Sequence, residues 1–151
     1  MVKKTITYTD FEGKEVTKDF YFNLSKMEFR RLDRKIPGGL EHMIDQIRTE
    51  KDEDRMIDLL DILILESYGE RAEDGRFVKE DPYGRRLSSF FKISEAWDTL
   101  FMNLVQNENE LQEFLTGIVP KDVAEQAQKE MANLENGLTP VAGKITPISD
   151  K

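Results

Sequence analysis

The sequence predicts a mainly helical α+β protein, in which an N-terminal β-hairpin is followed by about five or six helices and a disordered C-terminal tail. Three observations predict this fold. Apolar and polar residues alternate near the N-terminus, apolar residues recur at helical spacing after residue 25, and Gly, Pro, Thr and Ser dominate without periodicity after residue 135. We therefore expect a single globular domain over residues 1–135, made of a hairpin (4–24) and a helical part (25–135), and a flexible tail over 136–151.

Two alternating segments predict the hairpin. Ile6 and Tyr8 alternate with threonines, and Phe20 and Phe22 alternate with polar residues. Gly13 lies between the two segments and can take a positive φ without steric cost, as a tight turn requires. A lone two-stranded hairpin is marginal in water, so we expect it to pack on a helix or to pair with strands of another copy.

Local signals mark where the predicted helices begin and end. Ser25 and Glu28 have the spacing of a capping box, Asp52 can cap a later helix, and Gly69 suits the C-terminal cap of that helix. Residues 70–84 read as a polar connector with a short extended piece at 76–79. The predicted helices run from Ser25 to the Pro37-Gly38-Gly39 stop, over 40–50, over 52–68, from the Ser94 cap, over 109–117, and from Pro120 onward.

Two of these helices carry dense apolar patterns. The helix over 52–68 leaves only a thin polar stripe at Asp58 and Asp61. It is either the central core helix or a helix with one face against another subunit. Trp97 lies on a regular apolar stripe, which favours a core position over stacking on a ligand.

The composition excludes several classes of protein. Lysine and arginine total 22 and aspartate and glutamate total 30, which gives a net charge of −8 and argues against nucleic-acid binding. The chain has no cysteine, which fits a reducing cytosol. The sequence shows no secretory signal and no apolar run of the roughly 20 residues that a membrane span needs. We expect a protein that binds neither nucleic acid nor membrane.

The residues that could carry chemistry do not form a recognisable site. His42 is the single histidine, so a usual zinc site or a histidine-activated nucleophile has no partner residues. The acidic runs at 52–54 and 73–74 lack the spacing of a calcium loop, and Gly38-Gly39 lacks the rest of a phosphate-binding loop. We therefore predict no catalytic residue, no metal and no cofactor.

The features that remain are suited to contacts between proteins. The hairpin offers strand edges, and the last predicted helix has a narrow apolar stripe. The alternative for both regions is packing inside a single monomer. The candidate residues for binding a partner or for self-association are Ile6, Tyr8, Phe20 and Phe22 on the hairpin, and Val123, Ala127 and Met131 on the helix.

Several segments, in their order and spacing, resemble one protein family over roughly residues 3–125. They are Lys4-Thr5-Ile6-Thr7-Tyr8-Thr9-Asp10-Phe11 with Gly13, Phe20-Tyr21-Phe22-Asn23-Leu24-Ser25-Lys26, Leu65-Glu66-Ser67-Tyr68-Gly69-Glu70, Asp74-Gly75-Arg76-Phe77, Glu95-Ala96-Trp97, and Pro120-Lys121-Asp122. Together they resemble tail assembly chaperones of long, non-contractile-tailed phages and prophages of Gram-positive bacteria. Trp97 stands where this resemblance leads us to expect tyrosine.

The resemblance implies a non-enzymatic protein of the host bacterial cytoplasm. Such proteins coat the tape measure protein, keep it soluble, help to bring tail tube subunits to it, and leave before the virion is complete. It also implies the short product made before a programmed ribosomal frameshift. The free edges of the hairpin favour a homo-oligomer. Two alternatives stay open: an acidic inhibitor that mimics nucleic acid to block a host defence enzyme, which the charge of −8 suggests, and a structural connector retained in the tail.

Overall fold

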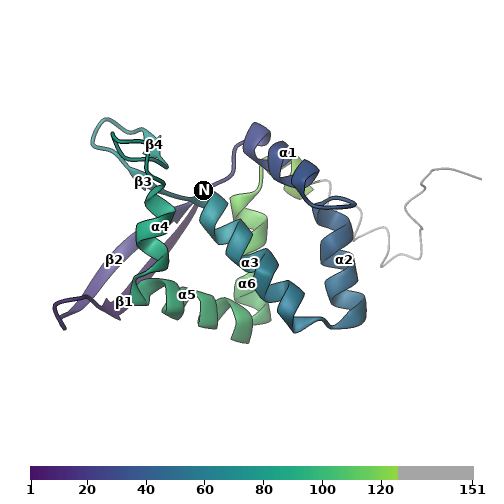
Figure 1. The fold of residues 1–151 in the computed structure, drawn as a ribbon, viewed down its shortest axis with the longest axis horizontal. Helices are drawn as coiled ribbons and strands as arrows, with labels where there is room; N and C mark the ends of the chain where they lie inside the picture. The colour runs from purple at the N-terminus through teal and green to yellow at the C-terminus, as the bar shows by residue number, and fades with distance from the viewer. Residues whose placement is uncertain (126–151) are drawn as a thin grey trace, which may run out of the picture. The chain divides into compact units, whose positions relative to one another are not determined.

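Up to residue 119 the structure has four strands and six helices, and the first hairpin comes before all the helices (Figure 1). The computed structural model describes residues 1–125, apart from the side chain of Arg48. The elements are β1 (Val2–Thr9), β2 (Glu15–Phe22), α1 (Lys26–Lys35), α2 (Leu40–Glu50), α3 (Glu53–Ser67), β3 (Tyr68–Arg71), β4 (Phe77–Val78), α4 (Leu87–Lys92), α5 (Glu95–Gln106) and α6 (Glu108–Ile118). The predicted α+β, mainly helical class is confirmed.

The chain divides into two units, residues 1–119 and residues 120–151. Of the second unit, residues 120–125 are described, and 121–125 are helical. The predicted end of the globular domain at residue 135 and the predicted flexible tail lie outside the described residues, so both stay predictions.

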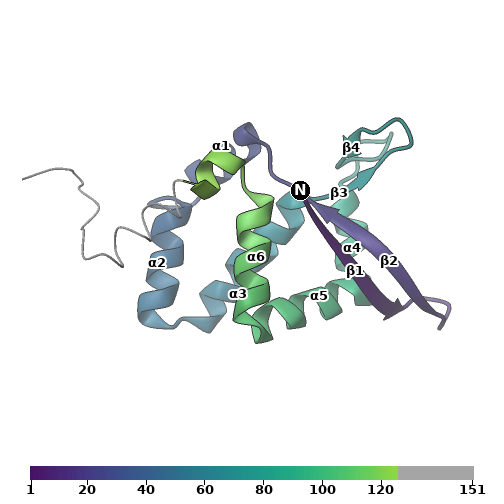
Figure 2. The same ribbon diagram turned by 180° about the vertical axis from the view of Figure 1, so that it is seen from behind.

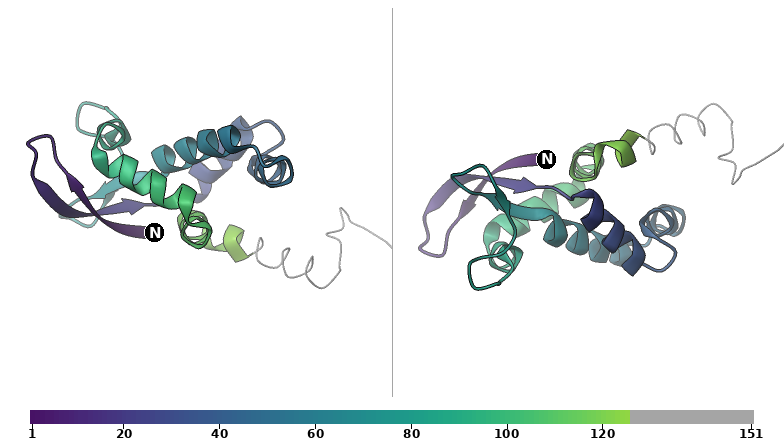
Figure 3. Two further views of the ribbon diagram at one scale, coloured as in Figure 1. Left: turned by 90° about the horizontal axis from the view of Figure 1, so that it is seen from below. Right: turned by 90° about the horizontal axis from the view of Figure 1, so that it is seen from above.

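The predicted hairpin is present, and its register separates an apolar face from a polar one. Ile6 faces the core, whereas Thr5 and Thr7 on the opposite face bond their cross-strand neighbours Asp19 and Thr17 at 2.6 and 2.8 Å. The inner face packs on α5 and α6 of the same chain. The hairpin's turn lies at its free end, beyond the helices (Figure 3).

The hairpin is the first half of a four-stranded antiparallel sheet, because β3 pairs with β2 and β4 pairs with β3. This corrects two predictions. The third helix ends at Ser67 rather than at Tyr68, and Gly69 lies in strand β3 instead of capping the helix. Gly69 is needed for a close approach, since a Cβ there would stand 2.6 Å from Cζ of Phe77 and 2.9 Å from the carbonyl oxygen of Val78.

Helices α1 to α3 begin and end largely where capping chemistry predicts. The Ser25–Glu28 capping box is formed in full, and the Asp52 side chain accepts the N–H of Arg55. Leu59, Leu60, Leu63 and Ile64 of α3 are buried, so this helix contributes its predicted core face, while Ile57 is exposed.

Helix α4 was not predicted, and it joins the sheet to the helices. Its Phe91 stacks on Tyr68 at 4.5 Å between ring centroids and meets Phe22 edge-on at 5.8 Å. Phe22 in turn meets Phe114 of α6 at 5.3 Å. Trp97 is buried against Phe91, which confirms its position in the core. These ring contacts join the hairpin to α4 and α6 and join α4 to α5. Figure 2 shows the same elements from behind.

Candidate interaction surface

Large apolar side chains are exposed at two turns and at the junction of two helices. Among the described residues the most exposed are Tyr83 at 84 %, Phe11 at 81 % and Ile93 at 66 %. Phe11 and Ile93 border the same groove, although they are distant in sequence. Exposed apolar groups that converge on one concave site are typical of binding surfaces, which makes this groove the candidate site.

The groove lies where the end of β1 and the following turn approach the α4–α5 junction (Figure 1). Its volume is ≈ 710 Å³, within the range of roughly 300–1,000 Å³ that is usual for ligand sites. We call it the hairpin groove and define it by its lining residues, which are Tyr8, Thr9, Asp10, Phe11, Lys18, Ile93, Ser94, Glu95 and Asp98.

The turn that carries Phe11 is held rigidly by a single aspartate. Oδ1 of Asp10 accepts the backbone N–H groups of Glu12 and Lys14, both at 2.9 Å, and the N–H of Asp10 donates to the carbonyl of Lys14 at 2.8 Å. Gly13 completes the turn with a φ of 83°. The exposed Phe11 ring is therefore presented by a backbone that is already ordered.

The opposite wall of the groove is also ordered. Ile93 follows α4 directly, and the hydroxyl of Ser94 donates to the carbonyl of Phe91 at 2.7 Å. This bond differs from the predicted one, because Ser94 stands at the N-cap position of α5 but makes no side-chain bond to that helix. Phe91 itself is in the aromatic core, so the corner that carries Ile93 is tied to the most tightly packed part of the fold.

The charged residues of the groove are mostly acidic. Asp10, Glu95 and Asp98 contribute three negative charges and Lys18 one positive charge, a sum of −2. Glu95 and Asp98 lie in the first turn of α5, where the helix dipole favours carboxylates. Within the described part of the chain none of these four residues forms an ion pair. Lys18, Glu95 and Asp98 are exposed, whereas Asp10 is partly buried and its Oδ1 already accepts two backbone N–H groups of the turn.

A second turn has the same backbone pattern and an equally exposed aromatic ring. Oδ1 of Asp81 accepts the N–H groups of Tyr83 and Arg85 at 2.9 and 2.8 Å, and Gly84 has a φ of 80°. Its surroundings differ, because the guanidinium of Arg85 lies 5.4 Å from the ring centres of both Tyr83 and Phe90. This turn does not line the hairpin groove.

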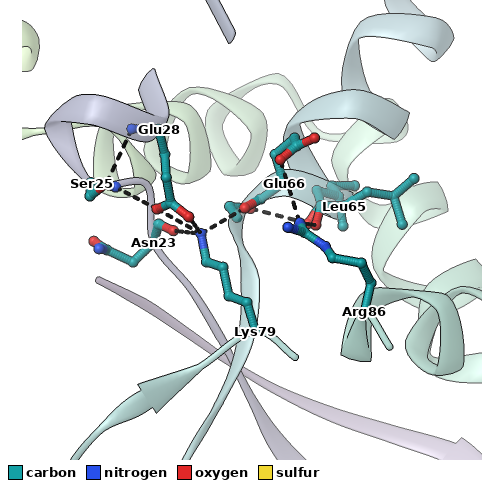
Figure 4. Close-up of polar contacts among 9 residues, drawn as sticks. Asn23, Ser25, Glu28, Leu65, Glu66, Lys79 and Arg86 are labelled. Atoms are coloured by element: carbon teal, nitrogen blue, oxygen red, sulfur yellow. Dashed lines mark hydrogen bonds and ion pairs between the residues drawn. The ribbon is translucent and has the colours of Figure 1, made fainter. Parts of the chain in front are cut away.

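A different kind of polar cluster lies at the C-terminal end of α3 (Figure 4). Nζ of Lys79 donates to the carbonyl oxygens of Asn23 and Glu66 at 2.8 and 2.7 Å, and to both carboxylate oxygens of Glu28 at 2.9 Å. We call these four residues the Lys79 junction. Lys79 is only 12 % exposed, and its contacts join β4 to α1, to α3 and to the segment that follows β2.

The Lys79 junction also supplies positive charge that α3 lacks, because the last turn of that helix has no basic residue. Lys79 and Arg86 bond the carbonyls of Glu66 and Leu65, the latter at 3.3 Å, and so serve as cationic caps from outside the helix. Burial alone would raise the pKa of Glu28, but the hydrogen bonds from Ser25 and the contact with Lys79 outweigh it and lower that pKa. Burial also lowers the pKa of Lys79, against the attraction of Glu28.

The described residues offer little for catalysis. No group of three or more His, Cys, Asp or Glu side chains among them is arranged to hold a metal ion, and His42 is exposed. No helix in the described part of the chain is long and apolar enough to cross a membrane.

A sequence profile of the family described as phage tail assembly chaperone matches residues 1–150. The chain belongs to this family. It is accordingly a chaperone rather than an enzyme, as predicted, and its partners are tail proteins.

Comparisons with curated proteins and with solved structures give no match. The inhibitor and connector alternatives receive no support from the family match, and the host group and the frameshift product stay predictions.

In this tail assembly chaperone the four candidate residues on the hairpin lie on its inner face. Ile6 and Phe22 are buried in the core of the single chain, and Tyr8 and Phe20 are partly buried. Tyr8 is the one of the four that lines the hairpin groove. A role of these residues in self-association stays a prediction, and in one copy of the chaperone they already have packing partners.

The candidate residues of the last predicted helix divide differently. Val123 is described and partly buried, whereas Ala127 and Met131 lie outside the described residues. The sequence reasoning did not select Phe11 and Ile93, since both lie outside the periodic patterns. A signal for Phe11 was present, because a large aromatic residue is unusual in a turn where small polar residues dominate.

Proposed function

We propose that this chaperone binds the tape measure protein of its phage, keeps it soluble in the host cytoplasm, supports tail tube assembly and leaves before the virion is complete. The family match over residues 1–150 is the observation that carries this proposal. The exposed Phe11 and Ile93 beside the hairpin groove support it, since a chaperone needs apolar surface that is free to bind.

Physical chemistry supports the proposed protection of the tape measure protein and the later release of the chaperone. A long protein with much apolar surface aggregates if it stays bare before its final partners cover it. Many copies of a small chaperone, each bound by modest contacts, can protect such a chain and still be displaced one by one. The net charge of −8 helps to keep the coated complex soluble.

The test is co-expression with the tape measure protein encoded in the same genome, followed by size-exclusion chromatography with light scattering. We expect the tape measure protein to stay soluble and to elute with several copies of the chaperone. A tape measure protein that stays insoluble while the chaperone elutes alone would contradict the proposal. The tail tube protein expressed with the same chaperone shows whether it joins the complex.

A further inference from the structure

We propose that the hairpin groove binds a segment of the partner protein in which apolar side chains stand beside lysine or arginine. This inference rests on the proposed function, which it deepens by naming the surface and the chemistry of the bound segment. It is carried by two properties of the groove: its exposed apolar side chains, and its exposed carboxylates Glu95 and Asp98, which form no ion pair among the described residues.

The apolar part of the argument comes from Phe11 and Ile93, which face the groove from opposite walls. The groove also has Tyr8 in its lining, so an incoming apolar side chain would meet three apolar or aromatic neighbours. Both exposed side chains stand on backbone that hydrogen bonds already hold, through Asp10 on one wall and Ser94 on the other. Binding therefore orders little of the chaperone, which favours affinity.

The charge of the groove determines which apolar segments it accepts. Its lining sums to −2, with Asp10, Glu95 and Asp98 against Lys18, and these charges form no ion pairs among the described residues. Asp10 holds the turn through its Oδ1, so the exposed carboxylates that face a partner are those of Glu95 and Asp98. A basic apolar segment would supply the missing positive charge, whereas an acidic one would be repelled. A second copy of this chain, with its net charge of −8, is a poorer electrostatic match than a basic segment of another protein.

The turn around Tyr83 provides a matched control within the same molecule. It has the same aspartate-held backbone and a ring as exposed as that of Phe11, but the Arg85 guanidinium lies 5.4 Å from the ring centre and Tyr83 does not line the hairpin groove. If exposed aromatic residues bound partners without regard to their surroundings, Phe11 and Tyr83 would contribute equally. The groove proposal requires that they do not.

The experiment uses short overlapping peptides that together cover the tape measure and tail tube proteins of the same genome, probed with the full-length chaperone. We expect binding to peptides that combine apolar residues with lysine or arginine, and loss of binding when those basic residues are replaced by glutamate. The double variant Phe11→Ala/Ile93→Ala should bind these peptides about tenfold more weakly or worse, whereas Tyr83→Ala should bind them as the wild type does.

Two outcomes overturn the proposal: no peptide binds, or the double variant binds the peptides as well as Tyr83→Ala does. Its failure is separable from failure of the proposed function. If co-expression yields a soluble complex but the groove variant binds normally, the chaperone uses another surface. If basic apolar peptides bind in the groove but the tape measure protein stays insoluble, the groove proposal stands and the tape measure proposal fails.

Discussion

The hairpin groove and the Lys79 junction use charged and apolar groups in opposite ways. In the junction the charges of Lys79 and Glu28 are buried or half-buried and fully bonded, and they join elements that are distant in sequence. In the groove the apolar Phe11 and Ile93 are exposed, and the nearby carboxylates of Glu95 and Asp98 are exposed and form no ion pair among the described residues. The junction thus stabilises the fold, and the groove is left free to bind.

This difference predicts that the two regions fail in different ways. A change in the junction should lower the free energy of unfolding and leave the binding of folded molecules intact. A change of Phe11 or Ile93 in the groove should weaken binding and leave the free energy of unfolding nearly unchanged, because both side chains are mostly exposed. The predictions below test this separation, beginning with the largest expected effect.

The same substitution can be made in both regions, because each contains one lysine. Lys79→Met keeps the apolar stem but removes the ammonium group from four oxygen acceptors, so we expect it to lower the free energy of unfolding by about 2–4 kcal/mol. Lys18→Met removes an exposed lysine and should change stability by no more than about 0.5 kcal/mol. Urea unfolding followed by circular dichroism measures both, and equal effects would contradict the comparison.

Two glycines outside both regions offer a second comparison, because Gly69 lies in strand β3 and Gly13 in the turn that carries Phe11. Gly69→Ala should cost about 1–3 kcal/mol, because the new Cβ meets the ring of Phe77 and a backbone oxygen. Gly13→Ala has free space but must hold a φ of 83°, so a cost of about 1–2 kcal/mol is expected from strain. Peptide binding should be normal for folded Gly69→Ala and weaker for Gly13→Ala, whose turn carries Phe11. Normal peptide binding by Gly13→Ala and weaker binding by Gly69→Ala would show that the turn does not position Phe11 for binding.

The smallest expected effect is a dependence of stability on pH. Because the pKa of Glu28 is lower in the folded chain than its ordinary value of 4.5, the carboxylate adds stability above pH 4.5 that is lost as the pH falls through the folded-state pKa. Glu28→Gln should therefore be less stable than the wild type by about 1 kcal/mol at neutral pH, and the difference should shrink in acid. A difference that stays constant between pH 7 and pH 3 in denaturant titrations would exclude this explanation.

Local signals predicted much of the fold. The first hairpin, the capping box at Ser25, the cap at Asp52 and the core position of Trp97 were predicted correctly, because each depends on residues close in sequence. Strand β3 was missed, because Tyr68-Gly69 after an apolar helix resembles a helix end and only its pairing with β2 makes it a strand. Helix α4, with six residues, is too short for a periodic pattern.

The candidate site was predicted less well, for a physical reason. Periodic apolar patterns identify side chains that become buried, and Ile6 and Phe22 were selected in this way. Phe11 and Ile93 have no periodic neighbours, and they meet only because the sheet packs on α4 and α5. The sequence therefore predicted the buried residues that support the groove but not its exposed apolar side chains. Among the predicted candidate residues, Tyr8 is the one that lines the groove.

The measurement that tests the central claim most directly is co-expression of the tape measure protein with the wild type, with Phe11→Ala/Ile93→Ala and with Lys79→Met, followed by purification of any complex and urea unfolding of each chaperone alone. We predict that the double variant unfolds at the same urea concentration as the wild type but co-purifies with little tape measure protein. We predict that folded Lys79→Met is less stable than the wild type but still binds the tape measure protein. A double variant that binds normally, or a Lys79→Met protein that folds and fails to bind, would contradict the separation of the two regions.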